Sequence, residues 1–110
     1  MSTPAHTQTP TPIISDYASD PDMLELIQMY VDEIPERVRT IQDYWNRGDI
    51  AELKRIAHQI KGASGGYGFP TVGAAAGMLE HHLATPTPDL NECSRQIDEL
   101  IDLCARVRVA

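Results

Sequence analysis

The chain has 110 residues, enough for one domain with a modest hydrophobic core. Its formal net charge of −7 argues against a general nucleic-acid binder, which needs a basic surface, and against an anionic membrane as a partner. No apolar run approaches the roughly 20 residues that span a bilayer, and the first residues lack the pattern of a signal peptide. We therefore expect a cytoplasmic protein whose two cysteines, Cys93 and Cys104, are reduced and buried.

A flexible N-terminal tail is expected over residues 1–14, ahead of a single domain over residues 15–110. The segment Met1–Pro12 reads MSTPAHTQTPTP, and its many threonines and prolines show no apolar periodicity. His6 lies alone in this segment, and we assign it no role.

The first helix is expected to begin near Asp20, which can cap it, with Pro21 in its first turn and Gly48 just after its end. Its apolar residues recur at steps of three and four: Met23, Leu24, Ile27, Val31, Ile34, Val38, Ile41 and Trp45. Pro35 interrupts this stripe, and a proline inside a helix costs roughly 3 kcal/mol. Because the stripe keeps its phase across the proline, we favour one long helix bent near Asp32–Pro35 over two abutting helices.

Three further helices are expected. The second follows Asp49, which can cap it, and runs to a turn at Gly68–Pro70. The third covers about residues 71–84 and the fourth about residues 89–107, with a break between them at Thr85–Pro88. Their expected core positions are Ile50, Leu53, Ile56, Ala57, Ile60, Ala63, Ser64, Tyr67, Val72, Ala75, Ala76, Leu79, Leu83, Leu90, Cys93, Ile97, Leu100, Cys104 and Val107. No strand pattern competes, so the sequence predicts an all-α, up-down-up-down antiparallel four-helix bundle with an extended N-terminal tail.

The second helix has an unusual surface beside its core stripe. His58 lies on the flank of this stripe, and the residues that share or border its face are Lys54, Arg55, Lys61, Gly62 and Gly65. Glycine costs about 1 kcal/mol against alanine inside a helix, and the usual compensation is close approach of another backbone or macromolecule. An exposed, neutral imidazole can carry a phosphoryl group on one nitrogen when an acceptor holds the other, and a nearby lysine can neutralise the phosphoryl oxygens.

The segment AHQIKGASGGYGF, followed by AAAGMLE, resembles the histidine-containing phosphotransfer (Hpt) domains of two-component phosphorelays. The matching elements are Ala57–Gly62, then Gly68-Phe69, then Leu79-Glu80, and the resemblance covers about residues 15–110. It implies a four-helix bundle that carries a phosphoryl group on His58, taken from the aspartate of one receiver domain and given to another. Such a protein is a phosphoryl carrier without its own nucleotide site, and not an enzyme in the usual sense.

The resemblance also implies roles for single residues. Lys61 would contact the phosphoryl group or the acid, Gly62 would clear room for the receiver, and Glu80 would orient the ring of His58. Our own hypothesis adds that Glu80 accepts a hydrogen bond from Nδ1–H, which leaves Nε2 as the nucleophile. Some members have a second histidine at the position of Gly77, and its absence favours transfer from a receiver over direct phosphorylation by a kinase domain. The receiver would supply Mg²⁺, so no cofactor and no metal site are expected in this chain.

The expected partners are response-regulator receiver domains, with a hybrid histidine kinase as a further candidate, and the chain itself is expected to be a monomer. The residues expected to contact a receiver are Lys54, Arg55, Gln59, Gly62 and Gly65. Lys54 and Arg55 either steer an acidic receiver or merely solvate the helix, and the sequence leaves both interpretations open. A bundle that binds receivers without taking phosphate is the main alternative function, whereas an enzyme would need a second catalytic group.

Two other motifs are interpreted as structural. His81 and His82 are adjacent, so their side chains diverge by about 100° on a helix, and we expect exposed residues here and no metal site. The segment GASGGYG lacks the preceding strand and the Gly-Lys-Ser/Thr ending of a nucleotide-binding loop.

Overall fold

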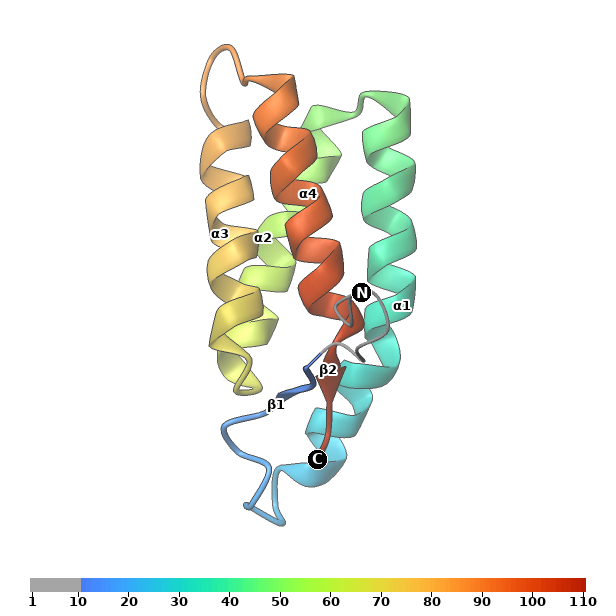
Figure 1. The fold of residues 1–110 in the computed structure, drawn as a ribbon, viewed down its shortest axis with the longest axis vertical. Coiled ribbons are helices and arrows are strands. Elements are labelled where there is room, and N and C mark those ends of the chain that lie inside the picture. Colours follow the sequence, from blue (N-terminus) through green and yellow to red (C-terminus); the bar gives the residue numbers. More distant parts are fainter. Residues whose placement is uncertain (1–10) are drawn as a thin grey trace, which may run out of the picture.

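Four helices run alternately up and down in the computed structural model, which describes residues 11–110 (Figure 1). They are α1 (Leu24–Arg47), α2 (Ile50–Gly66), α3 (Pro70–Leu83) and α4 (Leu90–Ala105). The predicted all-α antiparallel bundle is therefore confirmed. Among the described residues, no helix has both the length and the apolar character needed to cross a membrane.

Helix α1 continues through Pro35 without a break, as the phase of its apolar stripe predicted. It begins later than expected, because Asp20 closes a separate turn ahead of the helix. In that turn the backbone N–H of Asp22 donates to Asp20 Oδ1 at 3.0 Å, and the N–H of Met23 donates to the Asp20 carbonyl at 3.0 Å. Gly48 ends the helix at a φ of 69°, a left-handed conformation that glycine adopts without steric cost.

The core lies where the apolar faces of the four helices meet. Its fully buried large side chains include Ile27, Ile41, Leu53, Ile60, Phe69, Val72, Leu79 and Leu100. The apolar pattern also predicted burial of Leu24 and Leu90, and this was wrong: they are 38% and 58% exposed, and at the start of α1 it is Met23 that packs against the core. Tyr30, which is buried beside Ser64, was not among the expected core residues. Both cysteines are buried and free, as expected.

Helices α2 and α3 form the most extensive helix pair in the bundle. Asp49 caps α2 as predicted, since its side chain accepts a hydrogen bond from the backbone N–H of Glu52. The two helices are joined by a tight turn in which Gly68 has a φ of 85°, and Phe69 after it is fully buried. A Cβ at Gly73 would lie 3.4 Å from the carbonyl oxygen of Lys61, so glycine lets the two helix backbones approach closely there.

The residues before α1 differ from the sequence expectation. Ile13–Ile14 form a short strand, β1, that pairs in parallel with β2 (Val107–Arg108), although no strand was expected and Ile13–Ile14 were assigned to a flexible tail. Pairing between segments so distant in sequence leaves no local pattern to detect. The rest of the expected tail, 1–10, lies outside the described residues.

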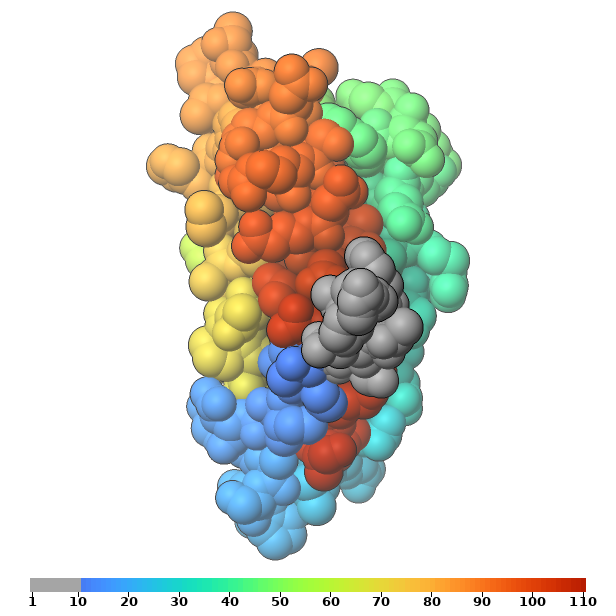
Figure 2. Space-filling view, viewed as in Figure 1, coloured from blue at the N-terminus to red at the C-terminus, as the bar shows by residue number. Residues whose placement is uncertain are grey.

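We call Thr11–Asp16 the N-terminal strap. Ser15 is buried, its Oγ donates to the carbonyl of Tyr67 at 2.6 Å, and the N–H of Asp16 donates to the carbonyl of Gly68 at 2.8 Å. Figure 2 shows the strap and the residues after it, in blue, across the lower end of the molecule beside the C-terminal residues in red. The strap therefore joins the C-terminal strand to the turn between α2 and α3.

Candidate functional site

The centre of the site is a contact between His58 on α2 and Glu80 on α3. Their atoms Nδ1 and Oε2 lie 2.7 Å apart, and the His58 side chain is 69% exposed whereas that of Glu80 is 24% exposed. Because a carboxylate oxygen can only accept, the contact favours the tautomer in which Nδ1 carries the proton. Nε2 has no hydrogen-bond partner among residues 11–110, so it is the nitrogen that remains available for chemistry.

Lys61 joins this pair from the next turn of α2. Its Nζ lies 3.8 Å from Glu80 Oε1, while the other carboxylate oxygen of Glu80 contacts His58. Lys61 is also 55% exposed, so its ammonium group is free to meet an incoming anion. The structure thus brings together His58, Lys61 and Glu80, the three residues expected to carry the chemistry.

The surface of α2 around His58 is bare. A Cβ placed at Gly62 or Gly65 would have no atom of the described chain within 4 Å, so these glycines are not needed for packing inside the bundle. Gln59, Gly62 and Gly65 are all exposed on α2. This face therefore offers an open backbone surface next to an exposed imidazole.

The two basic residues before His58 differ in their surroundings. Arg55 forms a bidentate contact with Glu52, and this pair raises the pKa of Arg55 and lowers the pKa of Glu52. Lys54 is exposed and pairs with no carboxylate of the described chain. The positive charge of Arg55 is thus largely compensated on the surface, and that of Lys54 is not.

A family model described as the Hpt domain matches residues 25–110, which is most of the chain. The chain belongs to the Hpt domain family. It is therefore a phosphotransfer module of two-component signalling, in a family whose members are phosphoryl carriers and interact with receiver domains. Comparisons with curated proteins and with solved structures gave no match. The match begins at Glu25, so the N-terminal strap of this Hpt domain lies outside it.

A buried polar contact behind the site was not anticipated. Tyr30 Oη and Ser64 Oγ lie 2.6 Å apart, and the Tyr30 ring stacks on Phe69 with ring centroids 4.8 Å apart. Burial raises the pKa of Tyr30 to about 12. Tyr30 lies three residues after Ile27, and this helical spacing was the signal in the sequence that could have placed it in the core.

The adjacent histidines of the Hpt domain have different environments. His81 is exposed, as expected, but the prediction of exposure was wrong for His82, which is half-buried between α3 and α4. His82 Nδ1 lies 3.2 Å from Gln96 Oε1, and its Nε2 accepts the backbone N–H of Asp89 at 3.0 Å. The His82 ring thus holds the loop between α3 and α4 in place. No group of three or more potential metal ligands occurs in residues 11–110.

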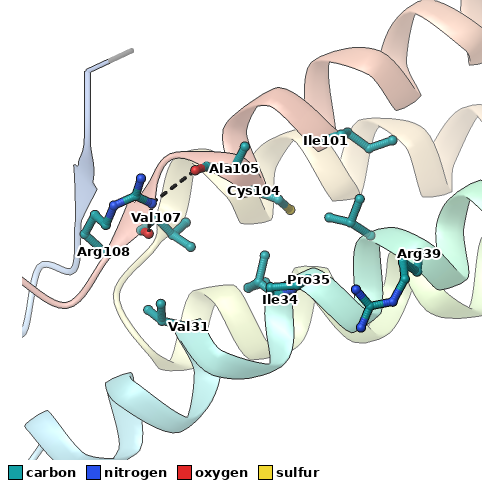
Figure 3. Close-up of a pocket in the computed structure, with 10 residues that line it drawn as sticks. Val31, Ile34, Pro35, Arg39, Ile101, Cys104, Ala105, Val107 and Arg108 are labelled. Carbon is teal, nitrogen blue, oxygen red and sulfur yellow. Dashed lines mark hydrogen bonds between the residues drawn. The ribbon is translucent and has the colours of Figure 1, made fainter. Parts of the chain in front are cut away.

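An apolar groove of about 410 Å³ lies away from His58, Lys61 and Glu80 (Figure 3). It is lined by Val31, Ile34, Pro35, Val38, Arg39, Ile101, Cys104, Ala105, Val107 and Arg108. These residues come from α1, α4 and β2, whereas His58 and Glu80 lie on α2 and α3. Burial raises the pKa of the Cys104 thiol to about 11, so this cysteine is not a reactive nucleophile at neutral pH.

Proposed function

We propose that His58 accepts a phosphoryl group on Nε2 from the phosphoaspartate of one receiver domain and passes it to the aspartate of a second receiver. The observation that carries this proposal is the contact of Nδ1 with Glu80 on a ring whose other nitrogen faces solvent. It supports an imidazole whose Nδ1 carries the proton, the tautomer that has its lone pair on Nε2.

The transfer exchanges one bond for another. The Nε2 lone pair attacks the phosphorus, the bond from phosphorus to the aspartyl oxygen breaks, and the aspartate leaves as a carboxylate. The ring then bears a positive charge, because Nδ1 keeps its proton while Nε2 holds the phosphoryl group. The Glu80 carboxylate, 2.7 Å from Nδ1, stabilises this charge, and the return step to a second aspartate reverses the sequence.

Lys61 and the receiver would share the negative charge of the phosphoryl oxygens. Lys61 is exposed one helical turn after His58, so its ammonium can reach a group bound to Nε2. We expect Mg²⁺ to come with the receiver, beside the phosphoaspartate. Transfer between two such sites depends mainly on positioning and charge neutralisation.

We propose that the receiver docks on the open face of α2. Gly62 and Gly65 would let the receiver backbone come close to His58, with Gln59, Lys54 and Arg55 at the edges of the contact. We expect the chain to act as a monomer in the cytoplasm, with a hybrid histidine kinase as a further candidate partner.

The test is phosphoryl transfer from a set of receiver domains loaded with a small-molecule phosphodonor. The chain should gain acid-labile, alkali-stable phosphate, and ³¹P–¹⁵N NMR should place it on Nε2 of His58. The variant His58→Gln should gain none, although it keeps a polar side chain at an exposed position that the fold does not need. Phosphate that persists on His58→Gln would refute the assignment.

The same experiment separates the main alternative, a bundle that binds receivers without taking phosphate. That alternative expects no phosphate on the wild-type chain and receiver binding that is equally tight for His58→Gln. The His58, Lys61 and Glu80 arrangement argues for transfer, because binding alone requires no oriented imidazole.

A further inference from the structure

The glycines around the site fall into two groups. Those on α2, Gly62 and Gly65, face open space, whereas Gly73 and Gly77 on α3 face α2. A Cβ at Gly77 would lie 3.3 Å from Cδ of Lys61, 3.6 Å from its Cε and 3.8 Å from its Cγ. The aliphatic stem of Lys61 therefore lies directly across the backbone of α3 at Gly77.

The antiparallel register of α2 and α3 explains this contact. Along the pair, His58 lies opposite Glu80, Lys61 lies opposite Gly77, and Ser64 lies opposite Gly73, each one helical turn from the last. A side chain at position 77 would occupy the space through which the Lys61 stem reaches Glu80. Inside a helix, glycine costs about 1 kcal/mol against alanine. At position 77 it leaves room for the Lys61 stem, which a side chain there would obstruct.

We propose that Gly77 is a positioning residue for phosphotransfer, which keeps the Lys61 ammonium beside the Glu80 carboxylate. This inference rests on the proposed function of His58. It concerns the path of one side chain, and no contact of Gly77 with the phosphoryl group is required.

The electrostatic consequence follows from the two roles of Glu80. Its carboxylate stabilises the positive ring that forms during transfer, but it also repels the phosphoryl oxygens that arrive on the same ring. A lysine ammonium 3.8 Å from Oε1 offsets this repulsion without displacing Oε2 from Nδ1. If Lys61 lost its path over Gly77, the ammonium would move into solvent, and the repulsion would be less well compensated.

The experiment compares Gly77→Val with Ala74→Val, an exposed position on the same helix. Transfer is measured from a phosphorylated receiver over a range of receiver concentrations. Gly77→Val should lower the transfer rate at saturating receiver about two- to fivefold, the size of a partly exposed ion-pair effect, with the half-saturating concentration unchanged. Ala74→Val should change neither quantity.

A second comparison isolates Lys61 as the group through which Gly77 acts. In a Lys61→Ala background, Gly77→Val should cause no further loss, because the side chain that it displaces is already gone. An equal loss with and without Lys61 would overturn the proposal. If the valine variant does not fold, Gly77→Ala should show a smaller loss in the same direction, since its Cβ requires the Lys61 stem to shift by only a few tenths of an ångström.

An NMR readout that needs no phosphate distinguishes this inference from the proposed function. The wild-type chain should show nuclear Overhauser contacts between the Lys61 methylenes and the Gly77 Hα protons, and their absence would overturn the inference by itself. The valine variant should lose the placement of Lys61 and keep the Nδ1–H tautomer of His58. A wild-type chain that shows these contacts but takes no phosphate would refute the proposed function and leave the placement of Lys61 established.

Discussion

At the scale of single residues, the glycines show how one residue type serves opposite purposes in this Hpt domain. Gly68 is buried in the turn between α2 and α3 with a φ of 85°, whereas Gly66 ends α2 with ordinary helical geometry and open space around it. A Cβ at Gly68 would lie 2.5 Å from Ser15 Oγ and 2.9 Å from the backbone nitrogen of Asp16. Composition alone cannot separate these two cases, because the difference lies in conformation and in a distant segment.

The pair Gly68→Ala and Gly66→Ala tests this difference. Gly68→Ala should lower the free energy of unfolding by at least ~2 kcal/mol, because alanine resists a left-handed backbone and its methyl group would displace the N-terminal strap. Gly66→Ala should leave stability unchanged or raise it by up to ~1 kcal/mol through higher helix propensity. Urea unfolding followed by circular dichroism measures both, and similar effects of the two changes would show that Gly68 is no more constrained than Gly66.

At the scale of elements, the sequence predicted the four helices because each buries a regular apolar face. The helical period of α2 placed Leu53, Ala57 and Ile60 in the core and His58 on the flank, and the structure confirms these positions. Helix boundaries were less predictable, since Asp20 caps a separate turn and its sequence does not distinguish that turn from a helix start. The strands could not be predicted, because a two-residue strand is defined only by its distant partner.

The three central residues of the candidate site were predictable from the sequence, but their contacts with neighbouring helices were not. The motif around His58 located the histidine, the lysine and the acid, and the structure brings these three together. The contact of Lys61 with Gly77 was missed, because it depends on the register between two helices and not on spacing within one. His82 was misjudged for the same reason, since its partners Gln96 and Asp89 belong to α4 and the loop before it.

The exposed face of α2 gives a prediction at this scale. Gly62→Leu should raise the half-saturating receiver concentration at least tenfold, because a large side chain would occupy the open surface beside His58. The melting temperature should stay the same or rise, since leucine has the higher helix propensity and a Cβ at this position meets no atom of the described chain. The matched control is Ala74→Leu on α3, which should leave receiver binding unchanged. Unaltered binding by Gly62→Leu would show that the receiver docks elsewhere.

At the scale of the whole molecule, stability is linked to pH through groups that the core keeps neutral. Burial raises the pKa of Tyr30 to about 12 and that of Cys104 to about 11, from ordinary values of about 10 and 9. The folded state therefore holds these protons more tightly than the unfolded state. The contribution of these two groups to the free energy of unfolding is complete below their pKa values in the unfolded state. It is lost as the pH rises through their pKa values in the folded state.

Alkaline unfolding should accordingly begin at moderately high pH. The free energy of unfolding should fall between about pH 9 and pH 12, by up to ~3 kcal/mol for each group, since one pKa unit corresponds to about 1.4 kcal/mol. Urea titrations at successive pH values measure the slope. Cys104→Ala should reduce the slope between pH 9 and pH 11, even though the variant is less stable at every pH. An unchanged slope in this variant would show that the thiol does not take part.

The alternation along α2 has a consequence for how partner choice can change. His58 and Gln59 are exposed between the buried residues Ile56, Ala57 and Ile60, so the exposed residues and the residues that hold the bundle together occupy separate faces of one helix. Substitutions on the outer face can therefore accumulate without a cost in folding. If the receiver docks there as proposed, its recognition could be changed in the laboratory, or drift during evolution, while Glu80 and Gly77 on α3 stay the same.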